Sequence, residues 1–295
     1  MYRPFRFGVV IANALSRTAF VTLARRAEEL GYTTLLMPDR TITGLAPLTA
    51  LAVAAEATTS LRVGSYVFCN DYRHPALLAK EVATLDFLSG GRFELGLGAG
   101  AGPFDYGQLG LPFEKGDVRV DRFEEALSVI KKLMTEESVN FYGKHYTITR
   151  MKGLPRPIQK PHPPIAIGCT GKRMLSLAAR EADSISIIFR LPTQGIDADN
   201  ESLEQKLAWV QEAAGARFVR LELSQLAYVL TINDGRTDRD FEGDGPPIPR
   251  IVMSAQQAVE HLLEQRERYG FSYIPVYGGA QMEKFAPVVA RLSGK

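Results

Sequence analysis

Short apolar runs alternate with helix-like stretches along nearly the whole of this 295-residue chain. The first unit is "FRFGVVI", residues 5–11, followed by a helical pattern that Ser16 can cap and that stops at Gly31. Eight such units can be counted. Strand-helix alternation indicates parallel strands joined by crossover helices, and eight units predict an α/β fold of the (β/α)8 TIM-barrel type. A doubly wound open sheet is the alternative.

The alternation is interrupted twice. After the fourth predicted helix, 118–134, the stretch "VNFYGKHYTIT" predicts a hairpin that turns at Gly143, with a proline-rich connector behind it. After the seventh predicted strand, 218–232, the polar stretch 233–250 predicts a loop without regular structure. We expect insertions after helix 4 and strand 7, where a barrel can grow lids, within a single domain covering residues 1–295.

Composition narrows the function classes. A net charge of +2 and a pI near 8.5 argue against a nucleic-acid partner. No apolar run reaches the ~18 residues that a spanning helix needs, so no membrane partner is expected. Cys69 and Cys169 lie far apart behind a start that does not resemble a signal peptide, which favours a cytoplasmic location. The four histidines show no metal-ligand spacing, so no metal is expected.

Residues 90–107, "GGRFELGLGAGAGPFDYG", look at first like a phosphate loop. Their glycines recur at every second position from Gly96 to Gly102, which does not match the G-x-G-x-x-G dinucleotide pattern. The next helix is predicted only from about Val118, too late to meet a phosphate held here. Alternating glycines at a strand end allow a flat ligand to approach the backbone. A plain wide turn fits the same letters equally well.

Three segments resemble the luciferase-like flavin and deazaflavin oxidoreductases. They are 70–113, "LGYTTLLMPDR" at 30–40 and "PPIAIGCTGKRMLSLAAREADSISI" at 163–187. The resemblance implies a bacterial luciferase-like barrel that binds its cofactor at the C-terminal ends of the strands. Segment 70–113 is more similar to the deazaflavin branch. This implies a homodimeric oxidoreductase that transfers a hydride between coenzyme F-420 and an unidentified small organic substrate.

Other functions stay open. An FMN-dependent monooxygenase is the first alternative, and a cofactor-binding protein with little catalysis is the second. An unrelated aldolase-like barrel would need a Schiff-base lysine at a strand end, and the predicted strand ends offer none.

The resemblance also implies cofactor-site residues. The segment after Ser65 often holds a non-proline cis peptide in this family and runs under the tricyclic ring. The loop after the fifth predicted strand leaves backbone N–H groups and a hydroxyl at a helix start, with basic residues beside them, which suits an anion. An ordinary buried strand and an ordinary strand-to-helix turn remain the alternatives. The candidates are Ser65, Tyr66, Phe68, Asn70, Gly98 and Gly100 for the ring, and Gly168, Thr170, Gly171, Lys172 and Arg173 for the phosphate.

Candidate catalytic residues follow from the same comparison. Asp39 and Arg40 stand where many family members have an acidic residue followed by His. An arginine stays charged, so it can donate hydrogen bonds or stabilise an anion but cannot release a proton. Ala101 stands where some deazaflavin dehydrogenases have a proton-donating Glu, and Asp105 is the nearest carboxylate. An Asp–Arg pair on the barrel rim without a catalytic role is the alternative.

Overall fold

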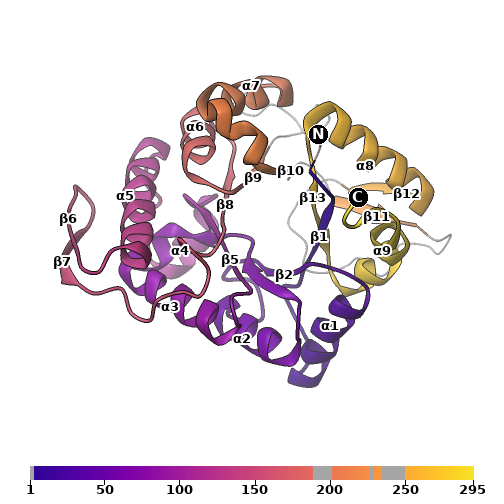
Figure 1. Cartoon of the computed structure of the whole chain (residues 1–295), viewed down its shortest axis with the longest axis horizontal. Coiled ribbons are helices and arrows are strands. Elements are labelled where there is room, and N and C mark those ends of the chain that lie inside the picture. The colour runs from indigo at the N-terminus through magenta and orange to yellow at the C-terminus, as the bar shows by residue number, and fades with distance from the viewer. Residues whose placement is uncertain (1–2, 189–200, 226–228, 234–249) are drawn as a thin grey trace.

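A computed structural model describes residues 3–188, 201–225, 229–233 and 250–295. Its main sheet is parallel and curls so that its end strands approach each other, with helices around the outside (Figure 1). The backbone N–H of Ser272 donates to the Leu223 carbonyl at 3.0 Å and links these end strands. The predicted (β/α)8 barrel is therefore confirmed. In spatial order its strands are β10 (Glu222–Gln225), β9 (Ser184–Ile187), β8 (Ile165–Cys169), β5 (Phe93–Gly98), β3 (Arg62–Ser65), β2 (Thr34–Met37), β1 (Arg6–Val10) and β13 (Tyr273–Tyr277).

The helices cover the outer face of the barrel because each presents an apolar stripe to it. Helix α1 starts where the Ser16 hydroxyl accepts the N–H of Ala19, and Gly31 ends it with a positive φ of 81°. Outward strand residues such as Phe7 and Leu35 are fully buried beneath the helices. The larger helices are α1 (Arg17–Glu29), α2 (Pro47–Ala57), α3 (Pro75–Leu88), α5 (Gly116–Thr135), α6 (Lys172–Glu181), α7 (Leu203–Ala214), α8 (Ala255–Tyr269) and α9 (Gly279–Leu292).

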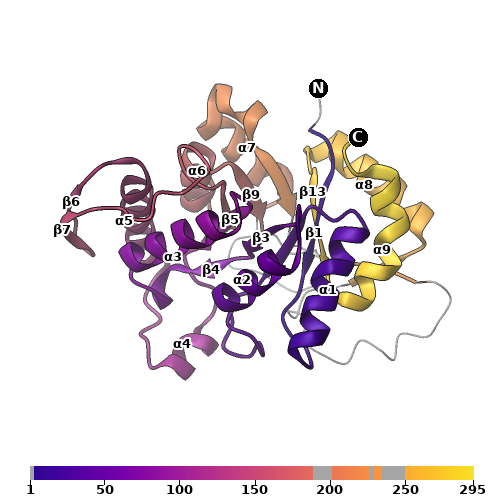
Figure 2. The same cartoon turned by 60° about the horizontal axis from the view of Figure 1, so that its bottom comes forward.

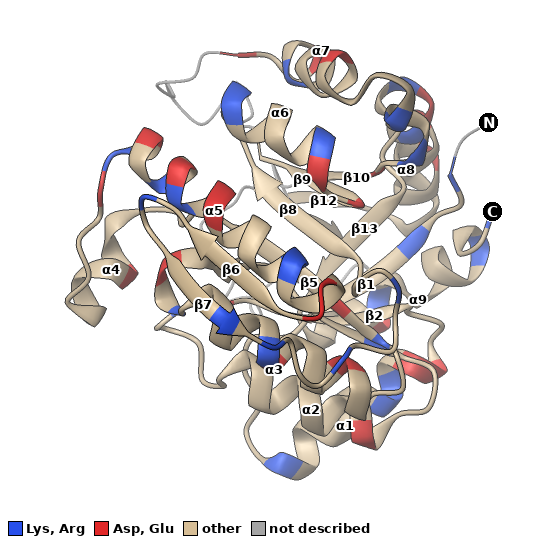
Figure 3. Ribbon diagram, turned by 60° about the vertical axis from the view of Figure 1, so that its left-hand side comes forward, with Lys and Arg blue, Asp and Glu red and all other residues tan. Residues whose placement is uncertain are grey.

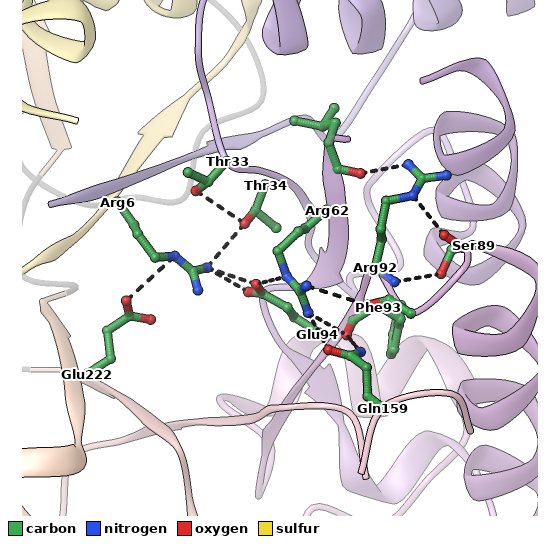
Figure 4. Close-up of polar contacts among 12 residues, drawn as sticks. Arg6, Thr33, Thr34, Arg62, Ser89, Arg92, Phe93, Glu94, Gln159 and Glu222 are labelled. Carbon is green, nitrogen blue, oxygen red and sulfur yellow. Dashed lines mark hydrogen bonds and ion pairs between the residues drawn. The ribbon is translucent and has the colours of Figure 1, made fainter. Parts of the chain in front are cut away.

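An ion-pair network closes the N-terminal end of the barrel (Figure 4). The guanidinium of Arg6 donates to both oxygens of Glu94, at 2.8 and 3.0 Å, and its Nε lies 3.6 Å from Glu222. Arg62 Nε reaches the same Glu94 carboxylate at 2.5 Å. These ion pairs occupy the N-terminal end of the barrel, whereas TIM-barrel enzymes bind their ligands at the C-terminal end.

The predicted seventh strand is the main departure from expectation. Residues 218–232 do not form one strand but a 3-10 turn η3 (Gly215–Arg220), strand β10 and strand β11 (Val229–Ile232). Strand β11 leaves the barrel and pairs in parallel with β12 (Arg250–Met253). The barrel strands are only four to six residues long, so a run of fifteen exceeds one strand. Most of the predicted loop 233–250 lies outside the described residues.

The predicted hairpin is confirmed. Strands β6 (Val139–Tyr142) and β7 (Thr147–Met151) pair antiparallel around Gly143. The Glu125 carboxylate on α5 accepts backbone N–H groups from Lys144, His145 and Tyr146, at 2.7, 2.9 and 3.1 Å. One side chain thereby holds the hairpin turn against α5.

The prediction that no helix begins before about Val118 is wrong. A short helix α4 (Pro103–Leu109) follows the glycines directly, and α5 begins at Gly116. Gly102 and Gly110 flank α4 with φ values of 77° and 67°, which glycine adopts without strain. Pro103 at the first helical position was the available signal. In Figure 2, α4 lies on the side of the molecule away from the two chain termini.

The surface carries both signs of charge. Figure 3 shows Lys and Arg interspersed with Asp and Glu on the helices that face the viewer. Within the described part of the chain, no helix combines the length and the apolar character needed to cross a bilayer.

Candidate active site

The C-terminal ends of the parallel strands gather most of the predicted site residues on one side of the barrel. This follows from parallel topology, because every strand then ends at the same face. The segments that meet there follow β2, β3, β5 and β8. TIM-barrel enzymes build their sites from these loops.

The segment after β3 bulges before it pairs again as β4 (Phe68–Cys69) beside β5. Its non-proline cis bond joins Tyr66 to Val67, one bond later than the resemblance implied. The Ser65 hydroxyl donates to the Gly96 carbonyl at 2.8 Å and accepts the Gly96 N–H at 2.9 Å. Ser65 therefore binds β5 and positions the bulge.

The other candidates on this segment turn in different directions. Tyr66 is buried in the barrel interior, where its hydroxyl faces those of Ser186, Ser224 and Tyr277. Phe68 is fully buried in the main core, where the Arg73 guanidinium lies 4.9 Å from its ring centroid. Asn70 begins the 3-10 turn η1 (Asn70–Tyr72), and its amide lies 3.5 Å from the Tyr146 hydroxyl of the hairpin. Of these side chains, Tyr66 lies best to reach a ligand in the barrel.

The alternating glycines make room for protein atoms. A Cβ on Gly96 would collide with the Ser65 carbonyl, and a Cβ on Gly98 would lie 3.0 Å from a Val67 methyl. A Cβ on Gly168, on the neighbouring strand β8, would lie 3.4 Å from the same methyl. The side chain of Val67 therefore fills the space beside the strand ends that the sequence suggested for a flat ligand. A ligand ring would meet Val67 and the bulge rather than bare glycine backbone.

Asp39 is engaged in a bidentate ion pair. Its two oxygens accept from Arg73 at 2.6 and 2.9 Å, and one of them also accepts the Cys69 N–H at 3.0 Å. The Asp39 side chain is only 7% exposed. This arrangement ties the loop after β2 to the segment after β4.

Asp105 is engaged in a similar way by the other side of the same loop. It accepts from Arg40 Nε at 2.6 Å and from the N–H and hydroxyl of Thr41, at 2.8 and 2.7 Å. Burial alone would raise the pKa of Asp105, but the hydrogen bonds from Thr41 and Arg40 outweigh it and hold that pKa below its ordinary value. Asp105 is therefore an ionised acceptor and has no proton to donate at neutral pH.

The loop after β8 presents hydrogen-bond donors at the start of α6. Among the described residues, no side chain caps this helix, and no atom lies within 4 Å of the Cβ position of Gly171 at its N-cap. The first-turn N–H groups are thus available to an anion. Exposed Lys172 lies 5.6 Å from the Trp209 ring, whereas Arg173 is paired with Asp121 at 2.6 Å. The donor set fits a phosphate group, with Arg173 held to one side by α5.

Besides Arg73, two further residues at this end were missed by the sequence reasoning. Arg119 of α5 donates to the carbonyls of Ala99 and Gly100, at 3.0 and 2.5 Å, and so fixes the glycine loop. Lys206 of α7 is 2% exposed and reaches the Thr170 hydroxyl. A detectable signal existed for Lys206, because it occupies an apolar position of the helical pattern Leu203, Lys206, Leu207, Val210.

Neither cysteine resembles a nucleophile. Both are free and buried. Burial raises the pKa of the Cys169 thiol to about 12, against an opposing effect of Lys206. A thiol in such surroundings stays protonated and unreactive.

Comparison with known proteins points to one family. A model described as "Luciferase-like monooxygenase" matches residues 4–227. The F420-dependent glucose-6-phosphate dehydrogenase of Amycolatopsis mediterranei is 31% identical over 171 residues, covering 55% of this chain and 51% of that protein. The FMNH2-dependent dimethylsulfone monooxygenase of Pseudomonas putida is 28% identical over 187 residues, covering 60% and 51%. The chain thus spans about half the length of these two relatives.

A solved structure agrees with the fold. The coenzyme F420 dependent tetrahydromethanopterin reductase from Methanopyrus kandleri superposes with a TM-score of 0.80 at 19% identity, covering 98% of both chains.

Proposed function

Because the chain belongs to the luciferase-like monooxygenase family, we propose that it is an oxidoreductase that transfers a hydride between coenzyme F-420 and a small organic substrate. The observation that carries this proposal is the donor-lined start of α6 at the C-terminal end of the barrel, which suits the phosphate of such a cofactor. The relatives include both an F-420-dependent and an FMNH2-dependent enzyme. The similarity of 70–113 to the deazaflavin branch is what supports F-420 over FMN in this proposal.

The roles of the chain in this reaction are binding and orientation. A bound deazaflavin would supply the hydride chemistry. Thr170 and the N–H groups of α6 would hold the phosphate, and Val67 with the bulge after β3 would support the ring. The ion pairs Asp39–Arg73 and Arg40–Asp105 would hold the surrounding loops in place relative to one another.

A proton donor for the substrate is proposed among the phenols. Neither Asp39 nor Asp105 is placed to release a proton, since both accept hydrogen bonds from cationic partners. Tyr277 ends β13 and packs with Tyr66 in one small cluster inside the barrel. Burial raises the pKa of both phenols, so both are protonated at neutral pH and would donate only to a strongly basic group, such as an alkoxide that develops on the substrate. We expect Tyr277→Phe or Tyr66→Phe to lower kcat at least tenfold, by loss of about 1.4 kcal/mol of transition-state stabilisation.

The deciding experiment is a titration of the purified protein with F-420 and with FMN, followed by the fluorescence of each. Saturable quenching of F-420 supports the proposal. Tight FMN binding without a response to F-420 contradicts it and favours the FMN-dependent monooxygenase, for which oxygen consumption in the presence of reduced FMN is the next measurement.

Cofactor binding without turnover is the second candidate, and the occupied carboxylates of Asp39 and Asp105 favour it. A panel of alcohols and aldehydes with bound F-420 separates the two, because a binding protein leaves the absorbance of the cofactor unchanged.

The proposal includes a homodimer. Helix α3 exposes Leu77 and Leu88, which lie eleven residues apart and therefore on the same helix face, at 60% and 68% exposure. Sedimentation velocity at several protein concentrations tests this. A monomer at all of them contradicts a dimer.

A further inference from the structure

Lys206 lies where a lysine is rarely found. Its side chain projects from α7 into the interior, and the residue is only 2% exposed. Its ammonium donates to the Thr170 hydroxyl at 2.5 Å and to the Ile188 carbonyl at 3.1 Å. Those oxygens lie just beyond the ends of β8 and β9, so a buried cation stands directly beneath the loop that starts α6.

The chemistry of the two groups fixes the direction of their hydrogen bond. An ammonium has three donors and no acceptor, whereas a hydroxyl can do both. Thr170 Oγ must therefore accept from Lys206, and its own hydrogen must point elsewhere. A hydroxyl that accepts from a cation is also polarised, which makes it a better donor to an anion.

We propose that Lys206 is a positioning residue for phosphate recognition: it holds the Thr170 hydroxyl as a donor toward the phosphate of the cofactor and adds a positive charge beneath it. This rests on the proposed function, since the phosphate is that of the cofactor proposed above. Thr170 follows β8 and precedes Gly171, so its hydroxyl and the first N–H groups of α6 lie at one strand end. Lys206 acts through Thr170 and the charge and need not touch the ligand.

A merely structural role for Lys206 would have a different effect. If the Lys206–Thr170 hydrogen bond only held α7 against the strand ends, its loss would affect all ligands at this end alike. It would weaken the binding of every such ligand, or it would leave the binding of all of them unchanged. Recognition of phosphate instead requires that only the phosphate part of the affinity be lost. The useful quantity is therefore the ratio of dissociation constants between a cofactor and its phosphate-free form.

The experiment measures that ratio by fluorescence titration for whichever cofactor the wild type binds. The pairs are F-420 against its phosphate-free deazariboflavin chromophore, and FMN against riboflavin. The variants are Lys206→Met, Lys206→Arg, Thr170→Val and the double variant Lys206→Met with Thr170→Val. Lys131→Met is the control, because Lys131 pairs with Glu181 at the far end of α6, about 15 Å from the loop.

We expect Lys206→Met to raise the dissociation constant of the phosphorylated ligand on the order of ten- to a hundredfold, as for loss of a charge-assisted hydrogen bond. The dissociation constant of the phosphate-free ligand should stay within about twofold of the wild-type value. Lys206→Arg should restore part of the ratio, and the double variant should lose less than the sum of the single losses. Lys131→Met should keep the wild-type ratio.

Two results overturn the inference in distinguishable ways. If the wild type binds F-420 but Lys206→Met weakens the binding of both ligands equally or of neither, Lys206 does not serve phosphate recognition, and the proposed function stands. If the wild type binds neither cofactor, the proposed function and the inference both fail. Should Lys206→Met not fold, Thr170→Val decides the same question, because it removes the hydroxyl that Lys206 is proposed to direct.

Discussion

The hydroxyl of Tyr106 occupies the place that a side chain on Gly100 would need. It donates to Asp71 at 2.9 Å and lies 3.4 Å from Cys69 Sγ, so α4 is locked to the segment after β4. Gly100 has a φ of 86°, and Gly102, two residues later, has a φ of 77° with no atom of the described residues within 4 Å of its Cβ position. Both glycines have a positive φ, but only the Cβ position of Gly100 lies against another side chain.

Gly100→Ala should therefore destabilise the protein more than Gly102→Ala. Gly102→Ala meets only a backbone penalty, of about 1 to 3 kcal/mol for its φ of 77° with a ψ of 152°. Gly100→Ala meets a positive-φ penalty of about 1 to 2 kcal/mol and must in addition displace Tyr106, at about 1 to 3 kcal/mol. Urea unfolding of both variants measures the difference. Equal losses would show that Tyr106 moves freely and that the close approach is unimportant.

We expect Asp39 to stabilise the fold through its ion pair with Arg73. Asp39→Ala should cost about 3 kcal/mol in the free energy of unfolding, because it leaves a largely buried guanidinium without its carboxylate. The double variant Asp39→Ala with Arg73→Met should cost less than the sum of the single losses. Additive losses, or a loss of turnover in Asp39→Asn at unchanged stability and affinity, would instead assign Asp39 to the chemistry.

Asp105→Asn should lower stability in a pH-dependent way. The native pKa of Asp105 lies below its ordinary value of 3.8, so its ionised form stabilises the fold. That contribution is complete above about pH 4 and is lost as the pH falls through the lower native pKa. Unfolding free energies of the variant and the wild type should differ by about 2 kcal/mol at pH 7, and the difference should shrink as the pH falls below about 4. A difference that does not change with pH would refute the ionised assignment.

The contribution of Glu222 to stability should depend on pH in the opposite direction. Burial, together with nearby Glu94, raises its pKa above the ordinary 4.5 despite the attraction of Arg6. Between 4.5 and the raised native pKa, the folded protein holds a proton that the unfolded chain has released. Stability therefore falls as the pH rises through that window. Glu222→Gln cannot titrate, so its stability relative to the wild type should increase over the same range, measured by chemical unfolding from pH 4 to 8. A flat or falling difference would contradict this.

The barrel itself was predictable because hydrophobic periodicity reports burial, and eight strand-helix units admit few parallel arrangements. The sequence predictions were wrong where the length of a strand, or a single residue such as Pro103, decided the structure and the hydrophobic periodicity did not. The run 218–232 is continuous in apolar character, yet a barrel strand uses about five residues, and the remainder pairs with β12. Helix α4 was missed because glycines stand at both of its ends, although Pro103 at its first position was a signal for a helix start.

The candidate site was predictable in place and less so in detail. The loop after β8 is an open helix start as the sequence indicated. The sequence around Asp39, Arg40 and Asp105 showed that charged residues lie at the strand ends, but it did not show which of them form ion pairs. Arg73 and Lys206 gained importance only through contacts with residues 34 and 36 positions away in the chain.

The sequence by itself determined the alternation of elements, the parallel barrel and the family, since these depend on patterns within short windows of the chain. The tertiary structure alone decided that Val67 fills the groove beside Gly98, that Tyr106 fills the space beside Gly100, and that Asp39 and Asp105 are already paired. The physical reason is that space and charge are shared between segments distant in the chain, and no local pattern records which two segments will share them.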